Sequence, residues 1–128
     1  MEKDKFTLPA TRRITDQRIY SEIFRRGARL KFPEFVLIFQ ENGLPYSRIG
    51  ISVGKRFGNA VRRNRAKRLC RELFRLNQYL LPQGVDIVFL PRQRLLETKW
   101  KKLLQNMQTA GRKIENRIRN KETDKKAV

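Results

Sequence analysis

Histidine is absent from this 128-residue chain, and cysteine occurs once, as Cys70. The commonest general base and zinc ligand are therefore missing, and a single thiol permits neither an intrachain disulfide nor a Cys/His metal site. Acidic residues number 12 against 31 Lys and Arg. They are scattered, with no short acidic motif that would hold paired Mg²⁺ ions. We expect no catalytic group and no metal site among the side chains of this protein.

Long hydrophobic runs are also missing. No apolar run approaches the ~18 residues of a membrane span. The first 13 residues lack the apolar stretch of a secretory signal, so we expect a cytoplasmic protein with no membrane partner. The length suits one domain, which we place at residues 1–115 with a loosely ordered arm at 1–11. Residues 116–128 are charged and low in apolar content, and this composition predicts a disordered tail.

Negative charge is the other scarce property, since the chain carries a formal net charge of +19 and has a sequence pI near 11.2. Such an excess is large for an enzyme that acts on a neutral small substrate. It predicts contacts with phosphates, electrostatically steered association and steep salt dependence. The composition alone therefore favours a nucleic acid as the partner.

Hydrophobic periodicity and turn residues predict an α/β domain of order α-β-β-α-β-α. We expect Thr15 to cap the first helix and Gly27 to end it, and Asn59 to cap the basic helix. The first two strands are expected to pair antiparallel across the turn between them. In chain order, the predicted elements are a helix at 16–26, strands at 35–40 and 48–53, a helix at 59–79, a strand at 85–90 and a helix from near Thr98 to Ile114.

The segment 55–75 concentrates the positive charge and contains one acid, Glu72. At helical spacing its apolar residues, Cys70 among them, fall on one side, so we expect a packed core cysteine. The opposite side is a cationic stripe interrupted by one amide, Asn64. A solvated helix face normally alternates charges of opposite sign, whereas arginine forks match phosphate oxygens. Together with the free N–H groups of a helix that starts at Asn59, the stripe predicts RNA binding.

The segment GKRFGNAVRRNRAKRLCRELF, residues 54–74, resembles the signature of the bacterial ribonuclease P protein subunit. A basic pair leads into GNAV and is followed by an RNR core and a KR pair. These positions are Lys55-Arg56, Gly58-Asn59-Ala60-Val61, Arg63-Asn64-Arg65 and Lys67-Arg68. The order of the predicted elements, from about Phe6 to Ile114, is also similar to that of the family.

The resemblance implies an α/β two-layer sandwich like the second domain of ribosomal protein S5, with a left-handed βαβ crossover. This handedness opposes the general rule for such units, and it places the basic helix between parallel strands at 48–53 and 85–90. The implied function is that of a non-catalytic protein subunit of an endoribonuclease. The catalytic ribonuclease P RNA, with Mg²⁺ bound mainly by that RNA, removes the 5′ leader from precursor tRNA. One protein per RNA is expected.

The resemblance also implies two groups of site residues. Those expected to bind the catalytic RNA are Lys55, Arg56, Asn59, Arg62, Arg63, Asn64, Arg65, Lys67, Arg68 and Arg71. Those expected in a cleft for the precursor leader, between the sheet and the first helix, are Tyr20, Phe24, Val36, Ile38 and Arg92.

The residues of the expected leader cleft match the family less completely than the residues of the 54–74 signature do. Tyr20 and Phe24 are four residues apart, on one face of a helix, and stacking of a base on such a ring is worth ~1–3 kcal/mol. The alternative for both rings is packing in the core. Ile38 stands where some members have tyrosine, which leaves apolar contact but not stacking. Some members have a basic residue in a short loop after the third predicted strand. Arg92 would fill that position here, although Pro91 shifts the local sequence pattern.

Three alternative functions fit the sequence less well. A structural RNA-binding protein of the ribosome or its assembly would have similar charge and fold, and the 54–74 signature is what separates it. A DNA-binding protein would be expected to show a helix-turn-helix pattern or a dimer zipper, and neither is present. An autonomous nuclease lacks the residues for the chemistry.

Overall fold

Four strands form one mixed sheet in the computed structural model, which describes the backbone of residues 12–127 and the side chains of residues 12–121. The spatial order is β1-β2-β4-β3, with β4 antiparallel to β2 and parallel to β3. The predicted antiparallel pairing of the strands at 35–40 and 48–53 is therefore wrong, because β4 lies between them. The strands are β1 (Ala28–Lys31), β2 (Phe35–Glu41), β3 (Arg48–Ile51) and β4 (Val85–Pro91).

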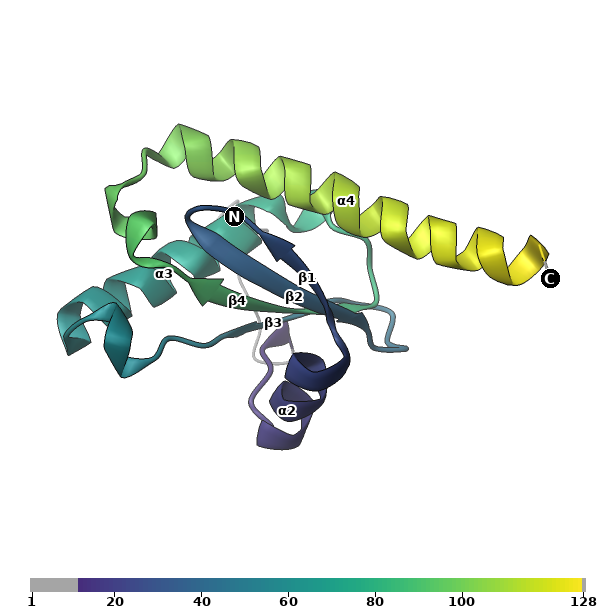
Figure 1. Ribbon diagram of the computed structural model, residues 1–128, viewed down its shortest axis with the longest axis horizontal. Coiled ribbons are helices and arrows are strands. Elements are labelled where there is room, and N and C mark those ends of the chain that lie inside the picture. Colours follow the sequence, from purple (N-terminus) through teal and green to yellow (C-terminus); the bar gives the residue numbers. More distant parts are fainter. Residues whose placement is uncertain (1–11, 128) are drawn as a thin grey trace, which may run out of the picture.

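Helices lie on both faces of this sheet (Figure 1). The main helices are α2 (Gln17–Arg26), α3 (Ala60–Asn77) and α4 (Trp100–Ala127), and short 3₁₀ segments are η2 (Lys55–Phe57), η3 (Gln78–Leu80) and η4 (Gln93–Glu97). Because α3 connects β3 to the parallel β4, the predicted position of the basic helix is confirmed. The predicted element order lacked β1. None of the helices among the described residues is both long and apolar enough to cross a membrane.

Alternate residues of β2 point to two separate cores, as the pleat of a strand requires. Phe35, Leu37 and Phe39 join the larger core, which α3 and α4 cover. Val36 and Ile38 join a smaller core with Ile23 of α2, on the other face. The predicted two-layer sandwich is therefore incomplete, because α2 adds a partial third layer.

The ends of α2 are fixed by side chains and by close packing. Asp16, and not Thr15 as predicted, is the N-cap, and its carboxylate accepts a hydrogen bond of 2.8 Å from the Arg18 N–H. Gly27 ends the helix as predicted, donating from its N–H to the Ile23 carbonyl at 2.7 Å. A Cβ at Gly27 would lie 2.5 Å from both that carbonyl oxygen and Ile38 Cγ2. The absence of a side chain thus lets the chain turn directly from α2 into β1.

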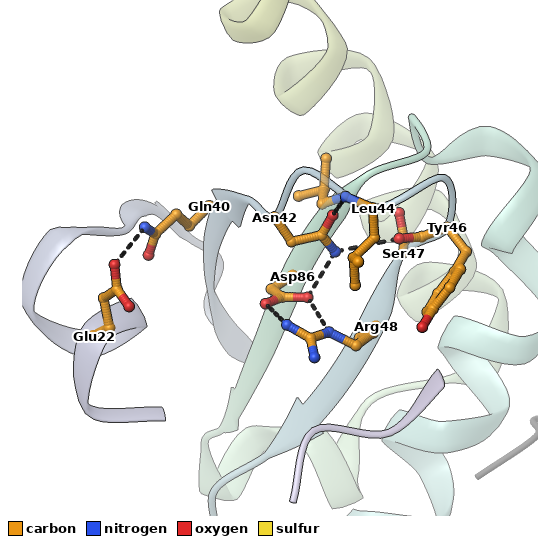
Figure 2. Close-up of polar contacts among 9 residues, drawn as sticks. Glu22, Gln40, Asn42, Leu44, Tyr46, Ser47, Arg48 and Asp86 are labelled. Atoms are coloured by element: carbon orange, nitrogen blue, oxygen red, sulfur yellow. Dashed lines mark hydrogen bonds and ion pairs between the residues drawn. The ribbon is translucent and has the colours of Figure 1, made fainter. Parts of the chain in front are cut away.

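A buried ion pair fastens β3 to the centre of the sheet (Figure 2). Asp86, with 4% of its surface exposed, accepts from Arg48 Nε at 2.8 Å and from a terminal guanidinium nitrogen at 2.7 Å. Asn42, in the turn after β2, donates to the same carboxylate at 2.8 Å. The carboxylate, chiefly by its hydrogen bond, raises the pKa of Arg48. The pair holds the strand that leads into α3.

The C-terminal segment differs from its prediction. Residues 116–127, predicted to be disordered, continue α4 without a break. The helix is anchored beyond Ile114 because Ile118 packs against the main core, and because the Arg117 guanidinium lies 5.8 Å from the centre of the Phe39 ring. Lys121 also lies 3.7 Å from a carboxylate oxygen of Glu41. The predicted arm at 1–11 lies outside the described residues.

Candidate RNA-binding surface

The basic helix α3 begins where the sequence predicted. The Asn59 side chain accepts a 2.9 Å hydrogen bond from the Arg62 N–H, as an N-cap does. Before it, Gly58 has φ +150°, a backbone conformation that favours glycine. A Cβ there would lie 3.0 Å from Arg62 Cδ. The Gly-Asn pair therefore sets the angle at which α3 leaves η2, and with it the direction of the basic face.

The outward face of α3 is cationic and carries almost no compensating charge. Arg65, Arg68 and Arg71 are exposed, and none of them forms an ion pair with a carboxylate of the described residues. The single acid of the helix, Glu72, is held by Arg75 at 2.7 Å. Hydrogen bonding to that guanidinium lowers the pKa of Glu72, so it remains ionised but already paired. What remains is a row of arginine forks directed at solvent, an arrangement suited to phosphate oxygens.

The inner face of α3 confirms the predicted core side, with one exception. Ala66, Cys70, Leu73 and Phe74 are fully buried, whereas Leu76, expected in the core, is 38% exposed. Burial raises the pKa of the Cys70 thiol to about 12. The thiol therefore stays protonated at neutral pH, which fits the prediction of a packed, unreactive cysteine.

The remaining predicted RNA-binding residues flank this face unevenly. Lys55, Arg56 and Arg62 are exposed near the start of the helix, as are Asn59 and Asn64, and Lys67 is half-buried. Arg63 is also half-buried, and its Nε is buried without a hydrogen-bond partner in the described part of the chain. Its position, 200° from Val61 at ~100° per residue, places it at the core edge of the helix. Arg63 is thus the member of the group least available to a partner in this conformation.

Tyr20 of α2 lies beside the basic helix, a neighbour that the sequence did not predict. Its hydroxyl oxygen accepts from the Ile51 N–H at 3.2 Å, and a Cβ at Gly50 would lie 2.6 Å from that oxygen. Burial raises the pKa of Tyr20. The ring borders a hollow of about 300 Å³ that Lys67 and Arg71 also line. An aromatic ring and two cations from α3 therefore share one open site.

The other residues predicted for a leader cleft are not all brought together with Tyr20. Phe24 is half-buried against the smaller core. Val36 and Ile38 are 7% and 0% exposed, because α2 packs over them. The structure therefore does not support the predicted contact of these two side chains with a leader. Arg92 is exposed after β4, where its N–H donates to the Glu34 carbonyl at 2.9 Å.

The carboxylates of the described residues do not form a metal site. No three or more His, Cys, Asp or Glu side chains in this part of the chain are grouped closely enough to hold an ion. The buried acids already have partners, Asp86 with Arg48 and Glu34 with the Asn106 amide at 2.7 Å. The donor set available to a cation is therefore poor.

Comparison with known proteins identifies the family. The family model for ribonuclease P matches residues 8–115. The ribonuclease P protein component of Thermotoga maritima is 47% identical over 85 residues, 66% of this chain and 73% of the relative. A solved structure of the Thermotoga maritima protein superimposes with a TM-score of 0.67 at 40% identity, covering 76% of this chain and 96% of that one. The Staphylococcus aureus ribonuclease P protein gives 0.68 at 30% identity, with 81% and 94% covered. This chain therefore belongs to the ribonuclease P protein family, the protein component of that ribonuclease.

Proposed function

We propose that this protein binds the catalytic RNA of ribonuclease P through the outward face of α3, and contacts the 5′ leader of precursor tRNA beside Tyr20. One protein would join one RNA in the cytoplasm, and the assembly would remove the leader in a Mg²⁺-dependent reaction. The observation that carries the proposal is the row of exposed arginines, Arg65, Arg68 and Arg71, without carboxylate partners among the described residues. A phosphate backbone is the partner that relieves such a concentration of charge.

The chemistry is assigned to the RNA because the side chains of the protein are poorly equipped for it. The sequence has no histidine, and the single thiol is buried with its pKa raised to about 12. The buried carboxylates are held by Arg48 and Asn106. Mg²⁺ is therefore proposed to be bound mainly by RNA phosphates, while the protein supplies positive charge and position.

The proposed leader contact rests on Tyr20 and its neighbours. A single-stranded nucleotide that stacks on this ring would place its phosphates near Lys67 and Arg71, which line the same hollow. Phe24, one helical turn further along α2, and Arg92 at the end of β4 are proposed to extend the path. Val36 and Ile38 are not included, since both are buried.

Replacing Tyr20 with Leu should weaken binding of leader-bearing precursor tRNA to the assembled ribonucleoprotein. Leucine retains apolar bulk against Gly50 but cannot stack on a base, so the expected loss is about five- to 100-fold in affinity. Binding of mature tRNA, measured in the same titration, should be unchanged. Equal loss for both RNAs would place Tyr20 outside a leader site.

Phe at position 20 is the matched control for this experiment. It keeps the ring and removes only the hydroxyl that accepts from Ile51. The Phe variant should bind the precursor nearly as the parent protein does. If Tyr20→Phe and Tyr20→Leu lost affinity equally, the role of Tyr20 would be to hold β3 and not to stack on a base.

A further inference from the structure

The outward face of α4 is a second cationic surface. Spacing of three or four residues aligns one stripe along the helix, made of Lys101, Gln105, Gln108, Arg112, Asn116 and Arg119. Lys102 and Lys113 flank this stripe and are also exposed. Glu115 is the one acid on α4 between Trp100 and Lys121, and Arg119 holds its partly exposed carboxylate at 2.7 Å. Gln105, Gln108 and Asn116 occupy positions of the stripe at which an ordinary solvated helix would carry glutamates.

An exposed aromatic residue stands against this stripe. Tyr79 and Leu80, in the 3₁₀ turn that follows α3, are 61% and 48% exposed. Gly111 lets α4 approach this turn, since a Cβ there would lie 2.7 Å from the Leu80 carbonyl oxygen. The result is a hollow of about 380 Å³, lined by Tyr79, Leu80, Gln108, Arg112 and Glu115. It combines a ring face, an apolar floor, a guanidinium and an amide with one carboxylate, Glu115, that is already paired with Arg119.

We propose that this surface, Tyr79 together with the outward stripe of α4, binds an unpaired RNA segment. A base would stack on Tyr79 above Leu80, the Gln108 amide would reach the edge of the base, and Arg112 with Lys113 would meet the adjoining phosphates. Basic grooves combined with aromatic platforms are the general means of binding single strands. The aromatic ring and the positive charge meet in one hollow between η3 and α4.

This surface is separate from the proposed leader contact. Tyr20 packs on the face of the sheet that α2 covers, whereas α4 lies on the opposite face (Figure 1). It also differs from the outward face of α3, since Tyr79 follows the C-terminal end of that helix. The inference therefore adds a second RNA contact to the function proposed above, and it can fail while that function stands.

Two variants of the full-length protein test the site with a defined probe, a fluorescent 12-nucleotide oligouridine. Tyr79→Leu should weaken binding of the probe about five- to 100-fold, whereas Tyr79→Phe, which keeps the ring, should not. Arg112→Ala with Lys113→Ala should reduce the slope of log K against log salt by about 0.7 per lost phosphate contact. Arg18→Ala with Arg25→Ala, on exposed positions of α2, removes the same charge as a control.

Crosslinking and full-length RNAs complete the test. Ultraviolet crosslinking of a 5-iodouridine probe should label the peptide that contains Tyr79. Loss of affinity for the catalytic RNA alone would assign the surface to that RNA, and loss only for leader-bearing precursor would assign it to the leader. The proposal is overturned if Tyr79→Leu and the paired Arg112/Lys113 variant bind the oligouridine as the parent protein does. That result, beside weakened catalytic RNA binding by α3 variants, would leave only the first RNA surface.

Discussion

Replacing Arg65 and Arg68 together with Ala should lower the affinity of this protein for ribonuclease P RNA by about 100-fold or more. Both side chains are exposed and make no ion pair within the described residues, so their loss should not unfold α3. A hydrogen bond to a charged group is worth about 1.5–3 kcal/mol, and two such contacts account for the expected change. The slope of log K against log salt should flatten by about one unit per lost phosphate contact.

The matched control is the double variant Arg18→Ala with Arg25→Ala, which removes the same charge from α2. It should change affinity much less, because diffuse attraction is largely screened beyond ~8 Å at physiological salt. An unchanged salt slope in the α3 variant would mean that this face remains in solvent in the complex. Equal effects of the two double variants would mean that net charge, and not the α3 face, governs binding.

Replacing Asp86 with Ala should have the largest effect on stability. The variant leaves the Arg48 guanidinium without its carboxylate. It also removes one of the two acceptors of the Asn42 amide, which keeps only the Tyr46 carbonyl at 3.2 Å. Removing one partner of a buried pair costs about 3–5 kcal/mol. Because the Arg48 side chain is 21% exposed, water can reach it, and we expect the lower end of that range. Urea denaturation followed by circular dichroism measures the free energy of unfolding.

Glu115→Ala is the comparison for Asp86→Ala. It also removes an arginine partner, but the Arg119 side chain is 72% exposed, and surface pairs contribute only about 0–1 kcal/mol. The Asp86 variant should therefore be clearly less stable than the Glu115 variant. Similar unfolding free energies for the two would show that the Asp86 cluster adds no more than a surface pair does.

Local patterns predicted the element types well because their causes are local. The Asn59 cap and the apolar side of α3 follow from spacing within about 20 residues of chain. β1 was missed because its four residues, ARLK, place only Leu30 in the core and show no sustained alternation. The position of β4 between β2 and β3 depends on contacts between distant segments, which no turn within residues 41–47 specifies.

The sequence pointed to individual candidate residues, but not to how these residues lie relative to one another. The helical wheel identified the arginines of α3, yet nothing in the sequence places Tyr20 beside Lys67, because β3 brings their two helices together. The burial of Ile38 depends on where α2 docks, and this too is a tertiary effect. The helix beyond Ile114 was missed because residues 116–121 are mostly polar, and the partners that anchor them, Phe39 and Glu41, lie far away in sequence.

We propose that this protein assists an RNA catalyst and performs no cleavage itself. The most direct test is cleavage of precursor tRNA at low Mg²⁺ by a cognate ribonuclease P RNA, with and without the protein. We expect 5′ processing only when both are present, and none with the protein alone. Tight RNA binding without any stimulation of cleavage would argue against this role and would favour a structural role in the ribosome or its assembly. Cleavage by the protein alone would contradict it as well.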